Sequence, residues 1–381
     1  MKILVAPAAF KESVSAHAVA RAIADGLKGA CPRLHVVEIP LSDGGNGFLE
    51  AVCATTGARL VRRIAIGPLG NHIPARFALS RTGSTAFVES ASVCGLHLVP
   101  PRHRSPLTLT TRGLGELMLR ALSAGARKVV VGLGGSAMMD GGVGALEALG
   151  ARFLDRKGRR IEGIVGADLC RIADVDVSSI HPLVRRASFV CACDVASPLL
   201  GPDGAARRFG PQKGATAREV AFAEESLRAY SRVLASLRPR NGRIASLPGA
   251  GAAGAMGLSL AALCGARLVQ GAELVLRLAG FAGRLRGAGL LVVGEGRIDA
   301  TTALGKAPCV AARMAKARGI ATVAVCGRLG RGWRSLKADG IVEFFPIAPG
   351  SGGPVLAEDE TRARLRAAGR RVADWLTSRK K

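Results

Sequence analysis

Four acidic residues stand where a parallel sheet would have its ligand-binding edge. Asp43, Asp140, Asp194 and Glu295 each lie at or just after the end of a short apolar run, in a glycine-rich or turn-prone stretch. If these runs are parallel strands, their carboxyl ends share the edge at which open α/β sheets bind ligands. Carboxylates at this edge can hold Mg²⁺ or accept a proton.

Basic side chains occupy comparable loops, namely Lys11, Lys213, Arg297 and Lys306. Cations neutralise phosphate charge, so acids and cations gathered at one sheet edge are typical of phosphoryl transfer. The pattern G-x-x-x-x-G-K-[ST] is absent from the sequence, which excludes a P-loop. A single acid in such a loop is more often a helix N-cap than a catalyst, so the prediction depends on the four acids together.

The glycine-rich stretch 132–142 follows a β-branched apolar run and precedes a short helical pattern. We expect the backbone N–H groups of Gly134, Gly135 and Ser136 to form an anion site there, to which Asp140 adds a carboxylate that could reach a metal. A tight turn that binds nothing is the simpler alternative.

A dinucleotide-binding turn is the main rival interpretation of the same stretch. Residues 132–137 fit a relaxed G-x-G-x-x-A pattern, and Asp155 lies ~20 residues further on, where a ribose-binding acid is expected. Residues 138–142 lengthen the turn before the helix, which argues against this pattern. A nicotinamide-dependent dehydrogenase is therefore the weaker alternative.

Strands, polar glycine loops and helices alternate along much of the chain. Ser15 and Thr216 are placed to cap helices, and residues 59–89 alternate as an antiparallel insertion would. Apolar runs predict strands at 2–6, 34–39, 128–131, 189–193 and 290–293. The alternation predicts an α/β fold built on a parallel sheet.

Length and composition indicate a folded protein of two or three domains, with 381 residues of which 49% are hydrophobic. The formal net charge of +26 raises the question of an anionic partner. The basic residues are spread along the chain and aromatic residues make up only 4%, so we expect no nucleic-acid-binding surface.

The nine cysteines lack the spacing of a disulfide framework or a zinc site. We expect reduced thiols and a cytoplasmic protein. The apolar stretch 3–10 is too short for a signal peptide. The uncharged stretch 244–266 is rich in glycine and alanine and contains Pro248, so we expect a buried helix there and no membrane contact.

Motifs along nearly the whole chain resemble those of bacterial glycerate kinases of type 1. They stand in the family's order at 6–13, 43–47, 67–70, 95–100, 115–116, 134–142, 193–198, 209–214, 248–253, 294–299 and 305–306. The resemblance implies ATP-dependent phosphorylation of D-glycerate to phosphoglycerate, with Mg²⁺, in glyoxylate and sugar-acid catabolism. It leaves open whether the product is 2- or 3-phosphoglycerate, and whether the protein is a homodimer.

The resemblance also implies a two-domain α/β enzyme with its active site in a cleft between the domains. We expect a Rossmann-like parallel-sheet domain built from the discontinuous segments 1–57, 106–150 and 285–381. The second α/β domain then comprises residues 58–105 and 151–284.

Site roles follow from the resemblance together with the residue types. The predicted catalytic residues are Lys11, Asp43, Asp194, Lys213 and Arg297. The predicted ATP-binding residues are Gly134, Gly135, Ser136, Asp140, Glu295 and Lys306, and Mg²⁺ is assigned to Asp194 and Glu295. Asp43 is the first choice to position or deprotonate the attacking hydroxyl.

The chain departs from the family's motifs at five loop positions. Ala8 and Asn46 stand where the family has Asp and Glu, and Ser197 stands where it usually has Asn. Met138 and Met139 replace Thr and Asn. These exchanges raise the alternatives of a lower catalytic rate, a different substrate, or a degenerate homologue that binds a sugar acid or nucleotide with little turnover.

Overall fold

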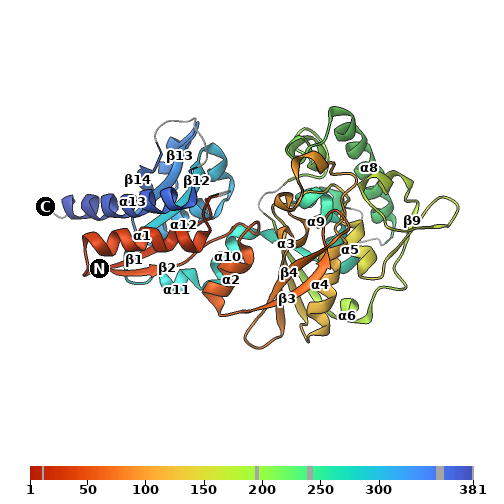
Figure 1. Cartoon of the computed structure of the whole chain (residues 1–381), viewed down its shortest axis with the longest axis horizontal. Helices are drawn as coiled ribbons and strands as arrows, with labels where there is room; N and C mark the ends of the chain where they lie inside the picture. Colours follow the sequence, from red (N-terminus) through yellow and green to blue (C-terminus); the bar gives the residue numbers. More distant parts are fainter. Residues whose placement is uncertain (11–12, 194–196, 238–242, 349–355, 380–381) are drawn as a thin grey trace. The chain divides into compact units, whose positions relative to one another are not determined.

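The computed structural model describes residues 1–10, 13–193, 197–237, 243–348 and 356–379 (Figure 1). The chain folds into two compact units. Unit 1 comprises Met1–Asp43, Glu50–Gly57 and Gly271–Lys381, and unit 2 comprises Gly44–Leu49 and Ala58–Gln270. The observed fold is α/β, as predicted, and each unit has a sheet of its own.

Among the described residues, five parallel strands form the sheet of unit 1, in the order β14-β13-β12-β1-β2. They are β1 (Lys2–Pro7), β2 (His35–Glu38), β12 (Ala288–Ile298), β13 (Thr322–Leu329) and β14 (Ile341–Pro346). The chain proceeds from β1 to one side of the sheet and from β12 to the other. The neighbours β1 and β12 therefore mark the topological switch point, where open sheets bind ligands.

Helices pack on the sheet of unit 1. α1 (Ala16–Ala30) and α13 (Glu358–Ser378) lie side by side and share a hydrophobic cluster with strand residues such as Ile3 and Val5 (Figure 1). α12 (Ala307–Lys316) packs against β1, β12 and β13 with residues outside that cluster. The remaining helices are α10 (Gly271–Leu278), α11 (Phe281–Arg284) and α2 (Phe48–Thr56), which begins in unit 2 and ends in unit 1.

The two predicted helix caps are confirmed. The Ser15 hydroxyl accepts a hydrogen bond from the N–H of Ala18 at 3.3 Å and begins α1. Thr216 begins α8 (Ala217–Ser236) with a capping box, in which its hydroxyl and the Glu219 carboxylate each accept from the other's backbone N–H. Both caps pair N–H groups that a helix leaves without intrahelical partners.

Unit 2 contains a mixed sheet, in which the described strands run in the order β11-β10-β6-β5-β4-β3. They are β3 (Arg59–Ile66), β4 (His72–Leu79), β5 (Thr85–Glu89), β6 (Lys128–Gly132), β10 (Ser188–Cys193) and β11 (Arg267–Gln270). β11, β10, β6 and β5 are parallel, whereas β4 and β3 are antiparallel to their neighbours. The antiparallel part confirms the alternation predicted at 59–89.

Residues 106–150 lie in unit 2, which corrects their predicted place beside 1–57. The reason is strand pairing, because β6 pairs with β5 and β10. Residues 271–284, predicted in the second domain, lie in unit 1, where α10 packs against α11 and α12. The sequence of a uniformly apolar parallel strand does not indicate which strands it pairs with.

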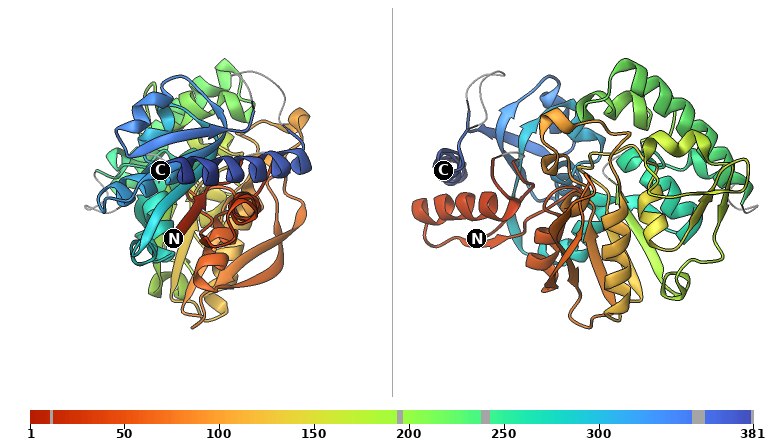
Figure 2. Two further views of the ribbon diagram at one scale, coloured as in Figure 1. Left: turned by 90° about the vertical axis from the view of Figure 1, so that its left-hand side faces the viewer. Right: turned by 45° about the vertical axis from the view of Figure 1, so that its right-hand side comes forward.

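Helices and a small antiparallel sheet complete unit 2. α4 (Arg112–Ser123) lies along the strands β3 to β6 (Figure 2). The other helices are α3 (Ala91–Cys94), α5 (Val143–Ala148), α6 (Pro182–Arg186), α7 (Ala205–Phe209) and α9 (Ala252–Cys264). The small sheet contains β7 (Arg152–Leu154), β8 (Arg160–Ile161) and β9 (Asp174–Asp176).

The stretch 244–266 contains the buried helix α9, as the small-residue composition predicts. Across the part of the chain that the structure describes, every helix is too short or too polar to span a membrane. No disulfide joins the cysteines of these residues.

Candidate functional site

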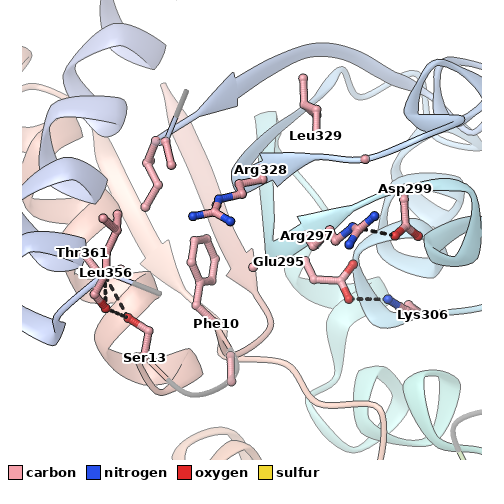
Figure 3. Close-up of a pocket in the computed structure, with 16 residues that line it drawn as sticks. Phe10, Ser13, Glu295, Arg297, Asp299, Lys306, Arg328, Leu329, Leu356 and Thr361 are labelled. Atoms are coloured by element: carbon pink, nitrogen blue, oxygen red, sulfur yellow. Dashed lines mark hydrogen bonds and ion pairs between the residues drawn. The ribbon is translucent and has the colours of Figure 1, made fainter. Parts of the chain in front are cut away.

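A pocket in unit 1 opens at the carboxyl ends of β12 and β13, beside the loop that follows β1 (Figure 3). We call it the unit-1 pocket, and its cavity volume is about 330 Å³. Among the described residues, the cations that line it are Arg297, Lys306 and Arg328, together with the carboxylates of Glu295 and Asp299. It lies at the switch point of the sheet, where the order of strands predicts a ligand site.

Within this group of charges, Glu295 and Lys306 form an ion pair, with 2.7 Å between Oε1 and Nζ (Figure 3). The second carboxylate oxygen of Glu295 accepts a hydrogen bond from the Thr302 hydroxyl at 3.0 Å. Both charged side chains are largely buried, so solvent screens the pair only in part. The pair fixes a cation and a carboxylate in the pocket.

Arg297 is the exposed cation of the pocket and pairs with Asp299 at 3.1 Å. Burial tends to raise the pKa of Asp299, but hydrogen bonds from Thr301 and the charges of Lys306 and Arg297 outweigh it and hold that pKa below its ordinary value. Asp299 also caps the short helix η7 (Ala300–Leu304) by accepting from the Thr301 N–H. Its carboxylate therefore orients both Arg297 and the loop that leads to Lys306.

Asp43 lies next to this group of charges within unit 1. Its Oδ1 accepts a hydrogen bond of 2.6 Å from the N–H of Ala307, the first residue of α12 and the neighbour of Lys306. A carboxylate at the start of a helix is stabilised by the helix dipole. The sequence separated Asp43 and Lys306 by more than half of the chain, and the fold brings their loops together.

The rest of the unit-1 pocket is apolar or carries hydroxyl groups. Phe10, Leu329 and Leu356 contribute apolar surface, and Arg328 extends from its strand toward Phe10 (Figure 3). The Ser13 and Thr361 hydroxyls lie 2.8 Å apart at the same end. This lining suits a ligand with a flat apolar group, which the cations of the pocket would flank.

The second group of predicted residues lies in unit 2, on the loop between β6 and α5. A Cβ added to Gly134 would lie 2.3 Å from the Cα of Gly45, and one added to Gly135 would lie 2.1 Å from Oδ1 of Asn46. Gly135 also has a φ of +70°, which disfavours other residues. The two glycine-rich loops, 44–47 and 132–135, are thus in direct contact. Neither Gly134 nor Gly135 has room for a side chain at this contact.

Hydrogen bonds hold the 132–137 loop from its other side. Leu96 N–H donates to the Gly135 carbonyl at 2.9 Å, and Ala137 N–H donates to the Cys94 carbonyl at 2.8 Å. Among the described residues, the N–H groups of Gly134, Gly135 and Ser136 have no acceptor. These are the donors that the sequence assigns to an anion.

Lys213 reaches the same loop from η4 (Pro211–Lys213). Its Nζ donates to Oγ of Ser136 at 3.1 Å and to the carbonyl of Met138 at 2.8 Å, and only 4% of the residue is exposed. Burial lowers the pKa of Lys213 from 10.5 to about 8, although the charge of Asp140 raises it. An ammonium has three donors, and the third can meet a ligand oxygen.

Asp140 is completely buried, and its carboxylate is occupied by donors of the chain itself. It accepts hydrogen bonds from the Thr111 hydroxyl at 2.6 Å and from the N–H groups of Thr111, Gly142 and Gly144. Burial raises the pKa of Asp140, and these hydrogen bonds lower it in part. The structure thus gives Asp140 a supporting role behind the loop, joining it to α4 and α5.

Met138 and Met139 are both completely buried in the core of unit 2. The main chain of Met138 supplies the carbonyl that binds Lys213, and the side chains point into the core. The exchanges at these positions therefore change packing beneath the loop. This finding weakens the expectation that they remove groups from a ligand surface.

The predicted site residues fall into two sets. Asp43, Glu295, Arg297 and Lys306 lie in unit 1, and Gly134, Gly135, Ser136, Asp140 and Lys213 lie in unit 2. Lys11 and Asp194 lie outside the described residues. Sequence reasoning missed Arg328, although this residue follows an apolar run. It also missed Thr111, whose hydrogen bond to Asp140 depends on the fold.

The dehydrogenase alternative depended on Asp155, which lies in the turn between β7 and β8. Its carboxylate accepts from the N–H groups of Lys157 and Arg159 and pairs with the Arg159 side chain. A ribose-binding acid follows the second strand of a parallel pair, whereas β7 and β8 are antiparallel. The structure therefore argues against a dinucleotide site at this loop.

The fold is α/β, and the site residues that the structure describes combine cations with carboxylates in unit 1 and with a glycine-rich loop in unit 2. A sequence profile of the glycerate kinase family matches residues 3–377, and the chain therefore belongs to that family. It is 39% identical to the glycerate kinase of Bacillus subtilis (strain 168), over 92% of this chain and 91% of the relative.

Two further relatives agree with this assignment. The chain is 40% identical to the glycerate 2-kinase of Escherichia coli (strain K12), over 86% of each chain. It also matches the crystal structure of a candidate glycerate kinase 2 from Salmonella typhimurium LT2 with a TM-score of 0.84 and 37% identity, over 100% of this chain and 99% of the other.

Proposed function

We propose that the chain transfers the γ-phosphoryl group of ATP to a hydroxyl of D-glycerate, giving phosphoglycerate and ADP. The observation that carries this proposal is the nearly full-length identity of 39–40% to relatives named glycerate kinase and glycerate 2-kinase. The order of motifs along the chain supports a member of the type 1 group. A homodimer and a cytoplasmic location are further parts of the proposal.

The unit-1 pocket takes the nucleotide in this proposal. Its apolar side suits a base, and Arg297, Lys306 and Arg328 supply positive charge for phosphate oxygens. The cavity of about 330 Å³ is within the range of small-molecule sites. Glu295 and Asp299 hold two of these cations in place before the nucleotide binds.

Lys213 and the 134–136 loop bind an anionic oxygen in this proposal, either of the phosphoryl group or of the glycerate carboxylate. The loop offers backbone N–H groups, and Lys213 offers a positive charge with a donor to spare. Fixed donors of this kind stabilise charge that develops during transfer without having to reorganise. Ser136 orients Lys213 by accepting one of its hydrogen bonds.

Mg²⁺ is proposed as the partner of one carboxylate and of the nucleotide, since no group of three or more His, Cys, Asp or Glu side chains among the described residues could hold the ion by itself. Proteins usually hold this ion with one or two carboxylates together with phosphate oxygens and water. Glu295 would hold it in the unit-1 pocket, and Asp194, outside the described residues, is the second predicted ligand. When bound, the ion neutralises phosphate charge.

Asp43 is the acid proposed to position or deprotonate the attacking hydroxyl. The hydrogen bond from Ala307 orients its carboxylate beside the loop that carries Lys306. A general base acts only within hydrogen-bond reach of the proton it accepts. We therefore expect Asp43→Asn to lower kcat with little change in the KM for ATP.

A release assay for ADP over a panel of hydroxy acids tests this function. We expect Mg²⁺-dependent ADP formation with D-glycerate and far less with L-glycerate or lactate. Phosphorus NMR of the product then distinguishes 2- from 3-phosphoglycerate. Preference for another hydroxy acid would contradict the proposed substrate and leave the proposed phosphoryl transfer intact.

A degenerate homologue is the second candidate, and the exchanges at Ala8, Asn46 and Ser197 favour it. Such a protein would bind ATP or glycerate by calorimetry and form no phosphorylated product. The retained cations and carboxylates of both units argue for turnover.

A further inference from the structure

A second pocket in unit 2 is lined by three arginines and lies apart from every residue assigned above. We call it the arginine pocket. It has a cavity volume of about 560 Å³ beside strands β3 and β4, and its polar lining is Arg62, Arg63, Arg76, Glu89, Ser92 and His97. Ile64 and Leu98 add apolar surface.

The strand register concentrates positive charge in this pocket. Arg62 and Arg76 stand directly opposite each other in the antiparallel pair of β3 and β4. Like charges in this position repel each other and destabilise a sheet. Arg62 and Arg63 are both exposed, but consecutive strand residues point to opposite faces, so only Arg62 shares its face with Arg76. The Arg63 guanidinium donates to the Arg62 carbonyl at 2.7 Å. An anion bound over this face of the strands would offset the repulsion between Arg62 and Arg76.

Glu89 is the one carboxylate among the described lining residues, and it faces backbone donors of another loop. Its two oxygens accept from the N–H groups of Gly47 and Leu49 at 3.1 and 3.0 Å, and the residue is only 5% exposed. The described lining thus combines three guanidinium groups with one carboxylate.

The segment 92–98, which contributes Ser92, His97 and Leu98 to the arginine pocket, also holds the 132–137 loop. The Leu96 N–H of this segment donates to the Gly135 carbonyl. Glu89 meanwhile anchors the facing loop 44–49. A ligand in the pocket therefore contacts residues that support both glycine-rich loops.

We infer that the arginine pocket is a second anion site, which binds the phosphate monoester group of a small metabolite. Guanidinium groups match phosphate because each presents paired N–H donors in one plane. The apolar surface of Ile64 and Leu98 suits the carbon part of such a molecule. The inference goes beyond the proposed function, because it assigns a separate site that takes part in no chemical step.

Calorimetry on the full-length chain tests the site. Inorganic phosphate and 3-phosphoglycerate are titrated with ADP and glycerate already saturating, so that the proposed active site is filled. We expect both phosphate probes to bind, and the variants below to separate this binding from any phosphate binding at the proposed active site. Equal affinity for the two phosphate probes would identify phosphate itself as the recognised group, and tighter binding of 3-phosphoglycerate would identify a phosphorylated metabolite.

Matched variants on one strand give the decisive comparison. Arg62→Gln and Arg63→Gln should each weaken binding about tenfold, the loss expected for one charge-assisted hydrogen bond. Arg59→Gln, an exposed position of β3 outside the pocket, is the control and should bind as the parent chain does.

Unchanged phosphate binding in both pocket variants would overturn the inference. An equal loss of binding in Arg59→Gln would also overturn it, because that result indicates a diffuse charge effect. Neither readout requires turnover. A chain that binds phosphate here but phosphorylates no hydroxy acid would contradict the proposed function alone.

Discussion

Lys213 is a cation inside a protein core, and its charge has a measurable cost. Its pKa is lowered to about 8, so the folded state releases a proton that the unfolded state retains between pH 8 and 10.5. Stability therefore increases as the pH rises through this window, because the unfolded state binds more protons there. A buried cation kept at such a cost is typical of a functional position.

The activity of the protein should have the opposite pH dependence. If the charged form of Lys213 binds an anionic oxygen, kcat/KM falls as the pH rises through about 8. Lys213→Arg keeps its charge throughout this range, so whatever activity it retains should persist to higher pH. A pH profile of kcat/KM measures both. A parent profile that stays flat to pH 10 would show that the charge of Lys213 is not needed.

Asp140 supports Lys213 without touching a ligand, and Asp140→Asn should reveal this in two ways. The variant brings an amide group toward four donors in the core, so the free energy of unfolding should fall by about 2–4 kcal/mol. Denaturant unfolding measures this loss.

The same variant should move the alkaline decline of kcat/KM to lower pH, because the charge of Asp140 raises the pKa of Lys213. Asp155→Asn, which removes a carboxylate from the turn between β7 and β8, is the control for the pH profile and should leave the alkaline decline unchanged. A normal stability and pH profile in Asp140→Asn would contradict the supporting role.

At the scale of elements, the two glycine-rich loops of unit 2 are in contact, and their glycines are not equivalent. Gly134→Ala would place its Cβ 2.3 Å from Cα of Gly45, so the loops must separate. Gly45→Ala would meet Cα of Gly134 at 3.5 Å, an ordinary contact. The two variants each add one methyl group, and only Gly134→Ala should disturb the contact between the loops.

We expect Gly134→Ala to lower kcat/KM about 100-fold, because a displacement of about 1 Å in positioned groups costs that much. Gly45→Ala should stay within about threefold of the parent chain. Steady-state kinetics measure the difference, and circular dichroism checks that both variants fold. Similar activity in the two variants would show that the contact does not shape the site.

Local patterns in the sequence predicted these elements well. The caps at Ser15 and Thr216, the glycine turn after β6 and the antiparallel strands at 59–89 all follow from residue type and period. Each of these features is decided by interactions over a few residues or by one hairpin. The same reasoning identified the loops that carry Lys213 and Lys306.

At the scale of the whole molecule, the same patterns could not assign strands to sheets. The acid-bearing loops were expected at one edge, yet those of Asp43 and Glu295 follow strands of unit 1 and that of Asp140 follows a strand of unit 2. Parallel strands such as β6 and β12 are both apolar and β-branched, so their partners depend on tertiary packing. The burial of Met138 and Met139 was equally invisible, because apolar residues in a loop motif suit a core and a ligand surface alike.

We propose that this member of the glycerate kinase family turns over D-glycerate through the cation of Lys213. The most direct test is ADP formation from ATP and D-glycerate, with and without Mg²⁺, by the parent chain and by Lys213→Ala. We expect glycerate-dependent ADP formation that requires Mg²⁺ and falls at least about 100-fold in the variant. Binding of ATP and glycerate by the parent chain without ADP formation, or full activity in Lys213→Ala, would contradict it.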